Sequence, residues 1–434
     1  MLPNIRTEIP GPVSRGWVDR LALRECPGIT ARRARRAAAI GASDTDPVVW
    51  AEAEGENVWD VDGNCFVDLC AGFGVASVGH RHPRVVAAGQ AQLALLPHAM
   101  GDAFPDPRRI ELMERLCALT GQDRVIFGSS GSDAVEAALK TAVLATGRQR
   151  ILTFDGGYHG LASAPLAAIG YHVEAFQSPF RALLGDFADR APYGTPPSAL
   201  PDLSGYAAVL VEPIQGRGGM RSPPTGWLTA LHVAARRAGC VIIHDEIYSG
   251  CGRTGRFLAA ETGETAETAE TAETNDKPDL LCIGKALAGG FPISACLGSA
   301  QVMDAWGASR GEAIHTQTFL GNPTGCAMAL AVLDVIRDEG LIERAQLKGD
   351  RFAKLLRAVP GVHAVTGRGM MLGVHMNDAL GVTRRLLATG WIVLPCGESA
   401  EALGLTPPLT LTDAAADGFV AALSHAISAP TTGC

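Results

Sequence analysis

The sequence predicts an α/β protein: a large domain with a mostly parallel sheet, and a smaller α+β domain formed by both ends of the chain. Two observations predict this fold. From about residue 80 to 325, short apolar runs alternate with amphipathic helical segments, as in a parallel sheet covered by helices. On either side, short strands and a long helix replace that alternation. We expect an N-terminal part of the small domain over 1–75, a large domain over 76–325 and a C-terminal part of the small domain over 326–434.

The individual elements follow from local patterns. Short strands are expected over 48–69, around a turn that contains the hairpin signal Asp62-Gly63. A long helical stretch is expected after residue 326. The remaining candidates are large-domain strands at 123–127, 150–154, 207–213, 240–246 and 279–284, helices at 133–147 and 225–239, and C-terminal strands around 363–369, 372–376, 390–397 and 405–412.

Two polar residues lie at the carboxyl ends of expected apolar strands, where ligands bind in this class of fold. Asp245 ends the run CVIIHD, and Lys285 follows DLLCIG just before a glycine-rich turn. In an α/β fold, ligands bind at the carboxyl ends of strands. A buried amine and a strand-end carboxylate are the two groups that pyridoxal 5'-phosphate chemistry needs, one to form an imine with the aldehyde and one to hold the pyridine nitrogen protonated. Taken singly, the residues also fit a turn cap and a surface charge.

The segment VIFGSSGSDAVEAAL contains a strand, a Gly/Ser loop and the start of a helix. Backbone amides at a helix N-terminus bind phosphate, and the hydroxyls of Ser130 and Ser132 add donors. Asp133 and Glu136 are expected to form a capping box at the start of this helix. An ordinary strand-to-helix turn is the alternative interpretation of the loop.

Composition restricts the class of protein. The 434 residues carry a net charge of −8, which argues against nucleic-acid or anionic-membrane partners. Eleven cysteines without a CxxC pair predict free thiols in the cytoplasm. The acidic triplet repeat within 261–277 contains no large apolar residue and is expected to be an exposed insertion.

Two further sequence patterns bear on dinucleotide binding and on metal binding. GCGRTG, residues 250–255, matches GxGxxG formally, but the helix that a dinucleotide site requires does not follow it. His80, His82 and His159 have no carboxylate or thiol at metal spacing, so no metal site is expected. Tyr158, at the end of a strand, is either a core residue or a ring that stacks on a flat cofactor.

Taken in order, the motifs SSGSDAVEAALK, GYHG, VEPIQG, HDEI–GCGRTG, IGKALAGGFP and HTQTFLGNP resemble those of the class III aminotransferases, which are fold-type-I enzymes dependent on pyridoxal phosphate. The resemblance extends from about residue 48 to 412. It implies an amino transfer between a primary amine or amino acid and a keto acid or aldehyde by a ping-pong cycle, in a homodimer with shared active sites.

The resemblance also implies residue roles. Lys285 would form the imine and move the proton, Asp245 would pair with the pyridinium nitrogen, and Glu212 would be the acid near cofactor and substrate. Further cofactor contacts would come from Ser130, Gly131, Ser132, Tyr158, Ile247, Tyr248 and the partner subunit's Thr318.

Four positions depart from the family pattern. Leu161 stands where 4-aminobutyrate enzymes have a carboxylate-binding arginine. Arg217 replaces a gating glutamate, and Gly404 replaces the arginine that pairs with it. Tyr248 replaces a glutamine. We therefore expect a substrate without a distal carboxylate, or a new carboxylate contact from Arg217.

Two rival functions remain. Aminomutases, racemases and epimerases of the same fold return the amine to the same molecule, and lost co-substrate contacts fit such an isomerase. A nucleotide-binding oxidoreductase or a non-catalytic binding module leaves Lys285 and Asp245 unexplained.

Overall fold

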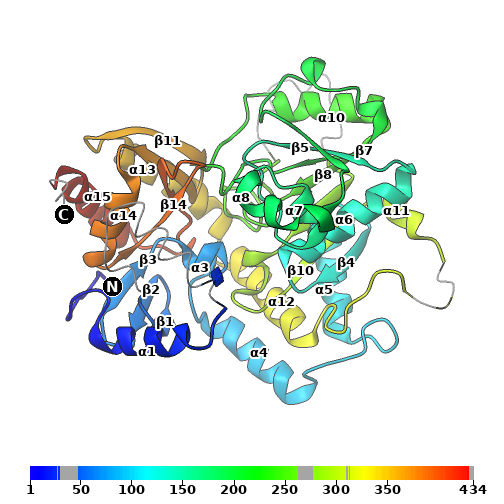
Figure 1. The fold of residues 1–434 in the computed structure, drawn as a ribbon. Coiled ribbons are helices and arrows are strands. Elements are labelled where there is room, and N and C mark those ends of the chain that lie inside the picture. Colours follow the sequence, from blue (N-terminus) through cyan, green and yellow to red (C-terminus); the bar gives the residue numbers. More distant parts are fainter. Residues whose placement is uncertain (27, 30–46, 262–276, 309–310, 312, 430–434) are drawn as a thin grey trace.

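The structure is a computed structural model, and it describes residues 1–26, 28–29, 47–261, 277–308, 311 and 313–429. The strands of this part form three sheets: a central sheet with the order β4-β10-β9-β8-β7-β5-β6, and two four-stranded sheets. In Figure 1 the central sheet and its helices occupy one side of the molecule, and both termini lie on the other. The acidic insertion falls almost wholly outside the described residues.

The central sheet is mostly parallel, as predicted. Only β10 runs antiparallel to its neighbours, and the parallel strands therefore place their carboxyl ends along one edge. Its strands are β4 (Arg124–Gly128), β5 (Arg150–Phe154), β6 (Ala188–Ala191), β7 (Tyr206–Val211), β8 (Val241–Asp245), β9 (Leu280–Ile283) and β10 (Ser294–Gly298).

Both faces of this sheet are covered, which explains why its inner strands are apolar throughout. Alternate residues of one strand point to opposite faces: Leu210 packs with α6, whereas Val209 packs with α10. Helices around the sheet are α4 (Pro83–Leu95), α5 (Pro107–Thr120), α6 (Gly131–Thr146), α7 (Ser163–Ala167), α8 (Val173–Gln177), α9 (Arg181–Leu184), α10 (Trp227–Arg237), α11 (Ala300–Met303) and α12 (Pro323–Asp338).

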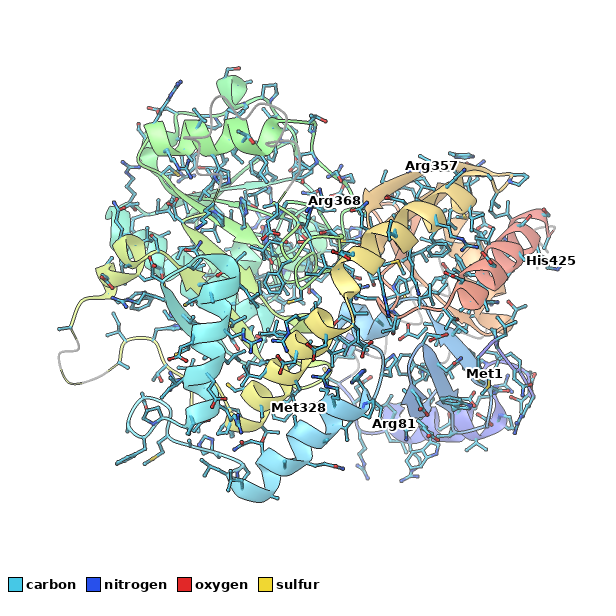
Figure 2. All side chains as sticks on the ribbon, turned by 180° about the vertical axis from the view of Figure 1, so that it is seen from behind. Met1, Arg81, Met328, Arg357, Arg368 and His425 are labelled. Carbon is cyan, nitrogen blue, oxygen red and sulfur yellow. The ribbon has the colours of Figure 1, made fainter. Side chains whose placement is uncertain are left out.

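α12 lies beside α4, and Figure 2 shows Met328 of α12 at this junction from behind. A glycine on α4 makes the approach possible, since a Cβ atom at Gly89 would lie 2.9 Å from the Met328 sulfur. The close packing fixes α12 against α4.

The two ends of the chain meet in one small sheet. β3 (Cys65–Asp68) pairs in parallel with β13 (Trp391–Ile392), so a strand from each end shares a sheet of order β1-β2-β3-β13. The other elements near the ends are α1 (Pro12–Ala22), β1 (Trp50–Glu54), β2 (Asn57–Asp60), α3 (Ala71–Gly74), α13 (Leu341–Arg357), β11 (Val362–Arg368), β12 (Met371–Met376), α14 (Ala379–Ala388), β14 (Leu394–Cys396), β15 (Ala402–Leu405) and α15 (Asp413–Ser428).

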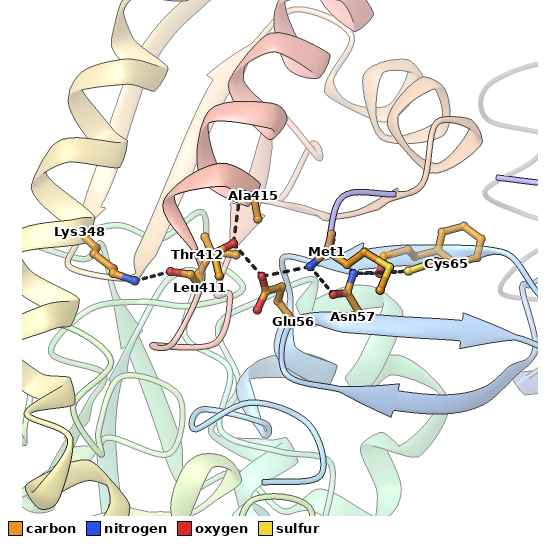
Figure 3. A network of polar contacts seen from close by, with 9 residues as sticks. Met1, Glu56, Asn57, Cys65, Lys348, Leu411, Thr412 and Ala415 are labelled. Carbon is orange, nitrogen blue, oxygen red and sulfur yellow. Dashed lines mark hydrogen bonds and ion pairs between the residues drawn. The ribbon is translucent and has the colours of Figure 1, made fainter. Parts of the chain in front are cut away.

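Polar contacts join these ends as well (Figure 3). The nitrogen of Met1 donates to Asn57 Oδ1 at 2.8 Å, and the hydroxyl of Thr412 donates to Glu56 Oε1 at 2.8 Å. Thr412 is also the N-cap of α15. These contacts hold the two ends of the described chain together; the division into domains, with boundaries at 75 and 325, stays a prediction.

Several elements differ from the predicted ones. The capping box at the start of α6 is formed by Ser130 and Asp133, because the helix begins at Gly131, earlier than expected. The helical stretch after 326 is two helices, separated where Gly340 adopts φ +60°. The last C-terminal strand ends at Leu405 and does not continue through the two prolines that follow.

Candidate active site

A cavity of about 610 Å³ lies at the carboxyl edge of the central sheet. Asp245 is the last residue of β8, Glu212 follows β7, and Lys285 follows β9 by two positions. All three line the cavity, together with Phe73, Ser130, Gly131, Ser132, Tyr158, His159, Leu161, Tyr171, Arg217, Met220, Ile247, Tyr248, Leu394, Pro395, Cys396 and Gly404. The sheet therefore collects in one place residues that lie far apart in the sequence.

Asp245 is fixed by two hydrogen bonds. His159 Nδ1 lies 2.8 Å from Asp245 Oδ2, and the backbone N–H of Ile247 donates to Oδ1 at 3.1 Å. The exposed fractions of His159 and Asp245 are 2% and 4%. A buried carboxylate is stabilised by such donors, so this arrangement holds an oriented negative charge at the cavity wall.

Lys285 is held in an unusual conformation. Its backbone angle φ is +39°, in a region that residues other than glycine rarely adopt. Backbone strain of this kind is typical of functional sites. Its Nζ lies 4.5 Å from the ring centroid of Tyr248. Burial lowers the pKa of the Lys285 amine, and Arg217 adds to this, whereas Asp245 and Glu212 oppose it. A lowered pKa favours the neutral amine, the form that is nucleophilic.

The start of α6 forms a concave set of donors. Gly131 and Ser132 are its first two residues, and within the described chain their backbone N–H groups donate to no protein acceptor. The loop after β5 closes over them: the Leu161 N–H donates to Ser132 Oγ at 3.2 Å. Gly160 allows this approach, since its Cβ would lie 2.0 Å from Ser132 Oγ at φ +112°. A phosphate group fits such a helix N-terminus.

Glu212 ties two loops together. Its oxygens accept from the Tyr158 N–H at 3.0 Å and the Gly216 N–H at 3.1 Å. Burial raises the pKa of the Glu212 carboxyl to about 7; Asp245 adds to the rise, while His159 and the two backbone donors oppose it. Burial therefore favours the protonated form of the Glu212 carboxyl.

Arg217 occupies the turn that Glu212 fixes. Its guanidinium carbon lies 4.2 Å from the ring centroid of Tyr158, in a cation–π contact. Leu161 and Gly404 line the same cavity. The three positions where a charged residue of the family pattern is replaced thus meet in one space.

Thr318 is the one predicted site residue outside this cavity. It is exposed, and it does not line the cavity of its own chain. His159 is the residue whose role the sequence did not reveal, because its partner Asp245 lies 86 positions away. A signal was present in GYHG, directly beside Tyr158.

The other two chemistries find no support in the described chain. No group of three or more His, Cys, Asp or Glu side chains within it is arranged to hold a metal ion. The described residues after GCGRTG, up to Glu261, form turns and no helix, so the dinucleotide motif lacks its structural context.

Comparison with known proteins gives a consistent assignment. The family model for aminotransferase class-III matches residues 40–427. An acetylornithine aminotransferase of Methanothermobacter thermautotrophicus is 34% identical over 389 residues, which cover 88% of this chain and 94% of the relative. A 4-aminobutyrate aminotransferase of Mycobacterium bovis is 34% identical over 455 residues and covers 94% of both chains.

Solved structures agree. An ornithine aminotransferase of Toxoplasma gondii superposes with a TM-score of 0.79 at 29% identity, over 95% of this chain and 97% of that one. An amine transaminase from an uncultivated Pseudomonas species, solved with pyridoxal phosphate bound, has a TM-score of 0.78 at 28% identity, over 88% of this chain and 95% of that one.

The chain belongs to the class III aminotransferases. It is a fold-type-I enzyme that uses pyridoxal phosphate to transfer amino groups, as the resemblance implied. The cavity fits this cofactor, since it combines a helix N-terminus for a phosphate, an amine for an aldehyde and a carboxylate for a ring nitrogen. The relatives named here are all aminotransferases, so the isomerase alternative gains no support from them.

Proposed function

We propose that Lys285 is the catalytic amine of an aminotransferase acting on amino acids or primary amines and on keto acids. The observation that carries this assignment is the meeting of Lys285, Asp245 and the start of α6 in one cavity. Pyridoxal phosphate supplies an aldehyde for the amine and a ring that withdraws electrons from the substrate carbon. The chain supplies the groups that hold the ring and move the proton.

Each group has a distinct task in this proposal. Gly131, Ser132 and the Ser130 hydroxyl bind the phosphate at the start of α6. Asp245, oriented by His159, keeps a proton on the ring nitrogen. The Lys285 amine accepts the proton from the substrate carbon and then donates it to the cofactor carbon. Its lowered pKa suits this role, because a general base works best with a pKa near the working pH.

The remaining cavity residues position the reactants. Tyr158 and Ile247 are proposed to contact the two faces of the cofactor ring. The centroid of the Tyr248 ring lies 4.5 Å from Lys285 Nζ. Glu212 holds the Tyr158 loop, and burial raises the pKa of its carboxyl. The geometry leaves the space between Arg217, Leu161 and Gly404 for the substrate.

The active site is proposed to be completed in a homodimer. Large apolar side chains are exposed on two adjacent segments, where Phe319 contacts His98 with ring centroids 5.3 Å apart. Extended exposed apolar surfaces mark interfaces between proteins. The exposed residues of these segments are Leu93, Leu95, Met100, Phe104, Ile314 and Phe319. Thr318 lies next to Phe319 of this surface, which supports the proposal that it contributes to the partner's phosphate site.

We also propose a cytoplasmic location. The ten cysteines of the described chain are all free thiols, which suits a reducing compartment. Within the described residues, no helix has the length and apolarity needed to cross a bilayer.

Subunit complementation tests the shared site. Lys285→Ala and Thr318→Asp each inactivate a homodimer, the first by removing the amine and the second by placing a negative charge against the phosphate. In a mixed dimer, one site combines the intact Lys285 of one subunit with the intact Thr318 of the other. Co-refolding the two inactive variants should therefore restore about a quarter of the wild-type activity. No recovery would show that Thr318 does not act across the interface.

A further inference from the structure

We infer that Arg217 forms a carboxylate-binding site and that this enzyme is specific for substrates carrying a single carboxylate. This inference rests on the proposed function, because it assigns Lys285 to the cofactor. Among the described residues that line the cavity, Lys285 is the one lysine and Arg217 the one arginine. Arg217 is therefore the cation that the described part of this subunit offers the substrate.

The Arg217 guanidinium is not neutralised by the part of the chain described. No Asp or Glu side chain there lies within 4.0 Å of it, and none of these residues accepts a hydrogen bond from it. The guanidinium carbon lies 4.2 Å from the centroid of the Tyr158 ring. Stacking on an aromatic face leaves the in-plane N–H donors free, so a planar carboxylate can bind edge-on without displacing the ring.

The backbone around Arg217 is fixed. The Gly397 N–H donates to the Arg217 carbonyl at 2.9 Å, and the Gly216 N–H donates to Glu212 at 3.1 Å. Arg217 is also near enough to Lys285 for its charge to affect that amine. The carboxylate site therefore shares the cavity with the reacting amine, and its backbone is held by hydrogen bonds on both sides.

Around Leu161 and Gly404, the described lining of the cavity has no basic side chain to offer a second carboxylate. Two positions where the family pattern has arginine are Leu161 and Gly404, which contribute no charge. Around them the wall consists mainly of Tyr171, Met220, Leu394, Pro395 and Cys396. Burying an unpaired carboxylate against such a surface is unfavourable, so a dicarboxylic substrate is disfavoured.

The test compares matched amino donors on the enzyme loaded with pyridoxal phosphate. Monocarboxylic donors are L-alanine, β-alanine and 4-aminobutyrate; ethylamine and propylamine are their carboxylate-free counterparts, and L-glutamate is the dicarboxylic one. The rate constant of the donor half-reaction is read from the absorbance of the bound cofactor. We expect the best monocarboxylic donor to exceed both its amine counterpart and L-glutamate by about 10-fold or more.

Variants assign this preference to Arg217. Arg217→Gln should lower the rate constant for the best monocarboxylic donor by about 10- to 100-fold more than that for the alkylamines, since the carboxylate contact is lost for the acids alone. Arg217→Lys, which keeps a point charge, should be intermediate. Arg181→Gln, which removes a charge from an exposed side chain outside the cavity, is the matched control and should change nothing.

A binding measurement supplies a second readout. Propionate has a carboxylate and no amine, and it should raise the melting temperature of the loaded wild type but not that of Arg217→Gln. Equal rates for L-glutamate and the monocarboxylic donors, or an unchanged donor preference in Arg217→Gln, would overturn the inference while leaving amino transfer intact. Failure of every donor to change the cofactor absorbance of the wild type would instead overturn the proposed function, and this inference with it.

Discussion

His159→Phe is the most informative substitution around the cofactor site, since it removes one donor from a buried carboxylate and nearly preserves the ring. His159 Nδ1 lies 2.8 Å from Asp245 Oδ2, and the Ile247 N–H donates to Asp245 Oδ1 at 3.1 Å. In the variant, the Ile247 N–H would remain and the His159 contact would be lost. We expect slower amino transfer because Asp245 would no longer be held in one orientation. His159 acts here as a positioning residue.

The size of the effect follows from the type of bond. A hydrogen bond to a charged group contributes about 1.5–3 kcal/mol, which corresponds to roughly a 10- to 150-fold change in rate. His159→Asn is the matched control, because its side-chain amide places a donor near the position of Nδ1. It should recover most of the rate.

The assay is a rapid-mixing measurement of the donor half-reaction, followed by the absorbance of the bound cofactor. The dissociation rate of the cofactor is measured in parallel for both variants. A rate in His159→Phe within twofold of the wild type would refute the reasoning. Equal losses in the Phe and Asn variants would assign the effect to packing and not to the hydrogen bond.

Two further predictions concern stability. Burial raises the pKa of the Glu246 carboxyl to about 7; Glu261 adds to the rise, and the hydrogen bonds of Glu246 oppose it. Between pH 4.5 and 7, the folded state therefore binds more protons than the unfolded state. The free energy of unfolding consequently falls as pH rises through this range. Glu246→Gln should make the loss between pH 5.5 and 8 about 2 kcal/mol smaller in urea unfolding, and an unchanged loss would contradict the assigned pKa. A Cβ at Gly216 would lie 2.3 Å from Tyr248 Cδ1, so Gly216→Ala should cost about 1–3 kcal/mol. Adding Tyr248→Gln should relieve most of that cost, whereas strictly additive urea midpoints would argue against the clash.

The sequence predicted the fold and most of the cavity because both depend on strand ends. Asp245 and Lys285 each follow a continuous apolar run, and parallel strands of this kind align their carboxyl ends. β6 was not predicted, since Ala188–Ala191 is a half-exposed edge strand with an Asp-Arg pair at its centre. β10 was missed as well, because Ser294–Gly298 is rich in small residues and lacks β-branched ones.

Contacts between loops that are distant in the chain could not be predicted from the sequence. The His159–Asp245 pair requires the loop after β5 to meet the end of β8, and no local pattern encodes that meeting. The stacking of Arg217 on Tyr158 depends on the turn that Glu212 fixes. The substitution at position 217 was visible in the sequence, but only the structure shows that its charge faces the cavity without an acidic partner in the described chain.

The measurement that tests the central claim most directly is the visible absorption spectrum of the purified protein with pyridoxal phosphate, for the wild type and Lys285→Ala. The account predicts a band in the wild type that is lost on adding an amino donor and returns on adding a keto acid. Lys285→Ala should not complete this cycle. A wild-type band that never changes while substrate is consumed, or a Lys285→Ala variant that cycles like the wild type, would contradict the account.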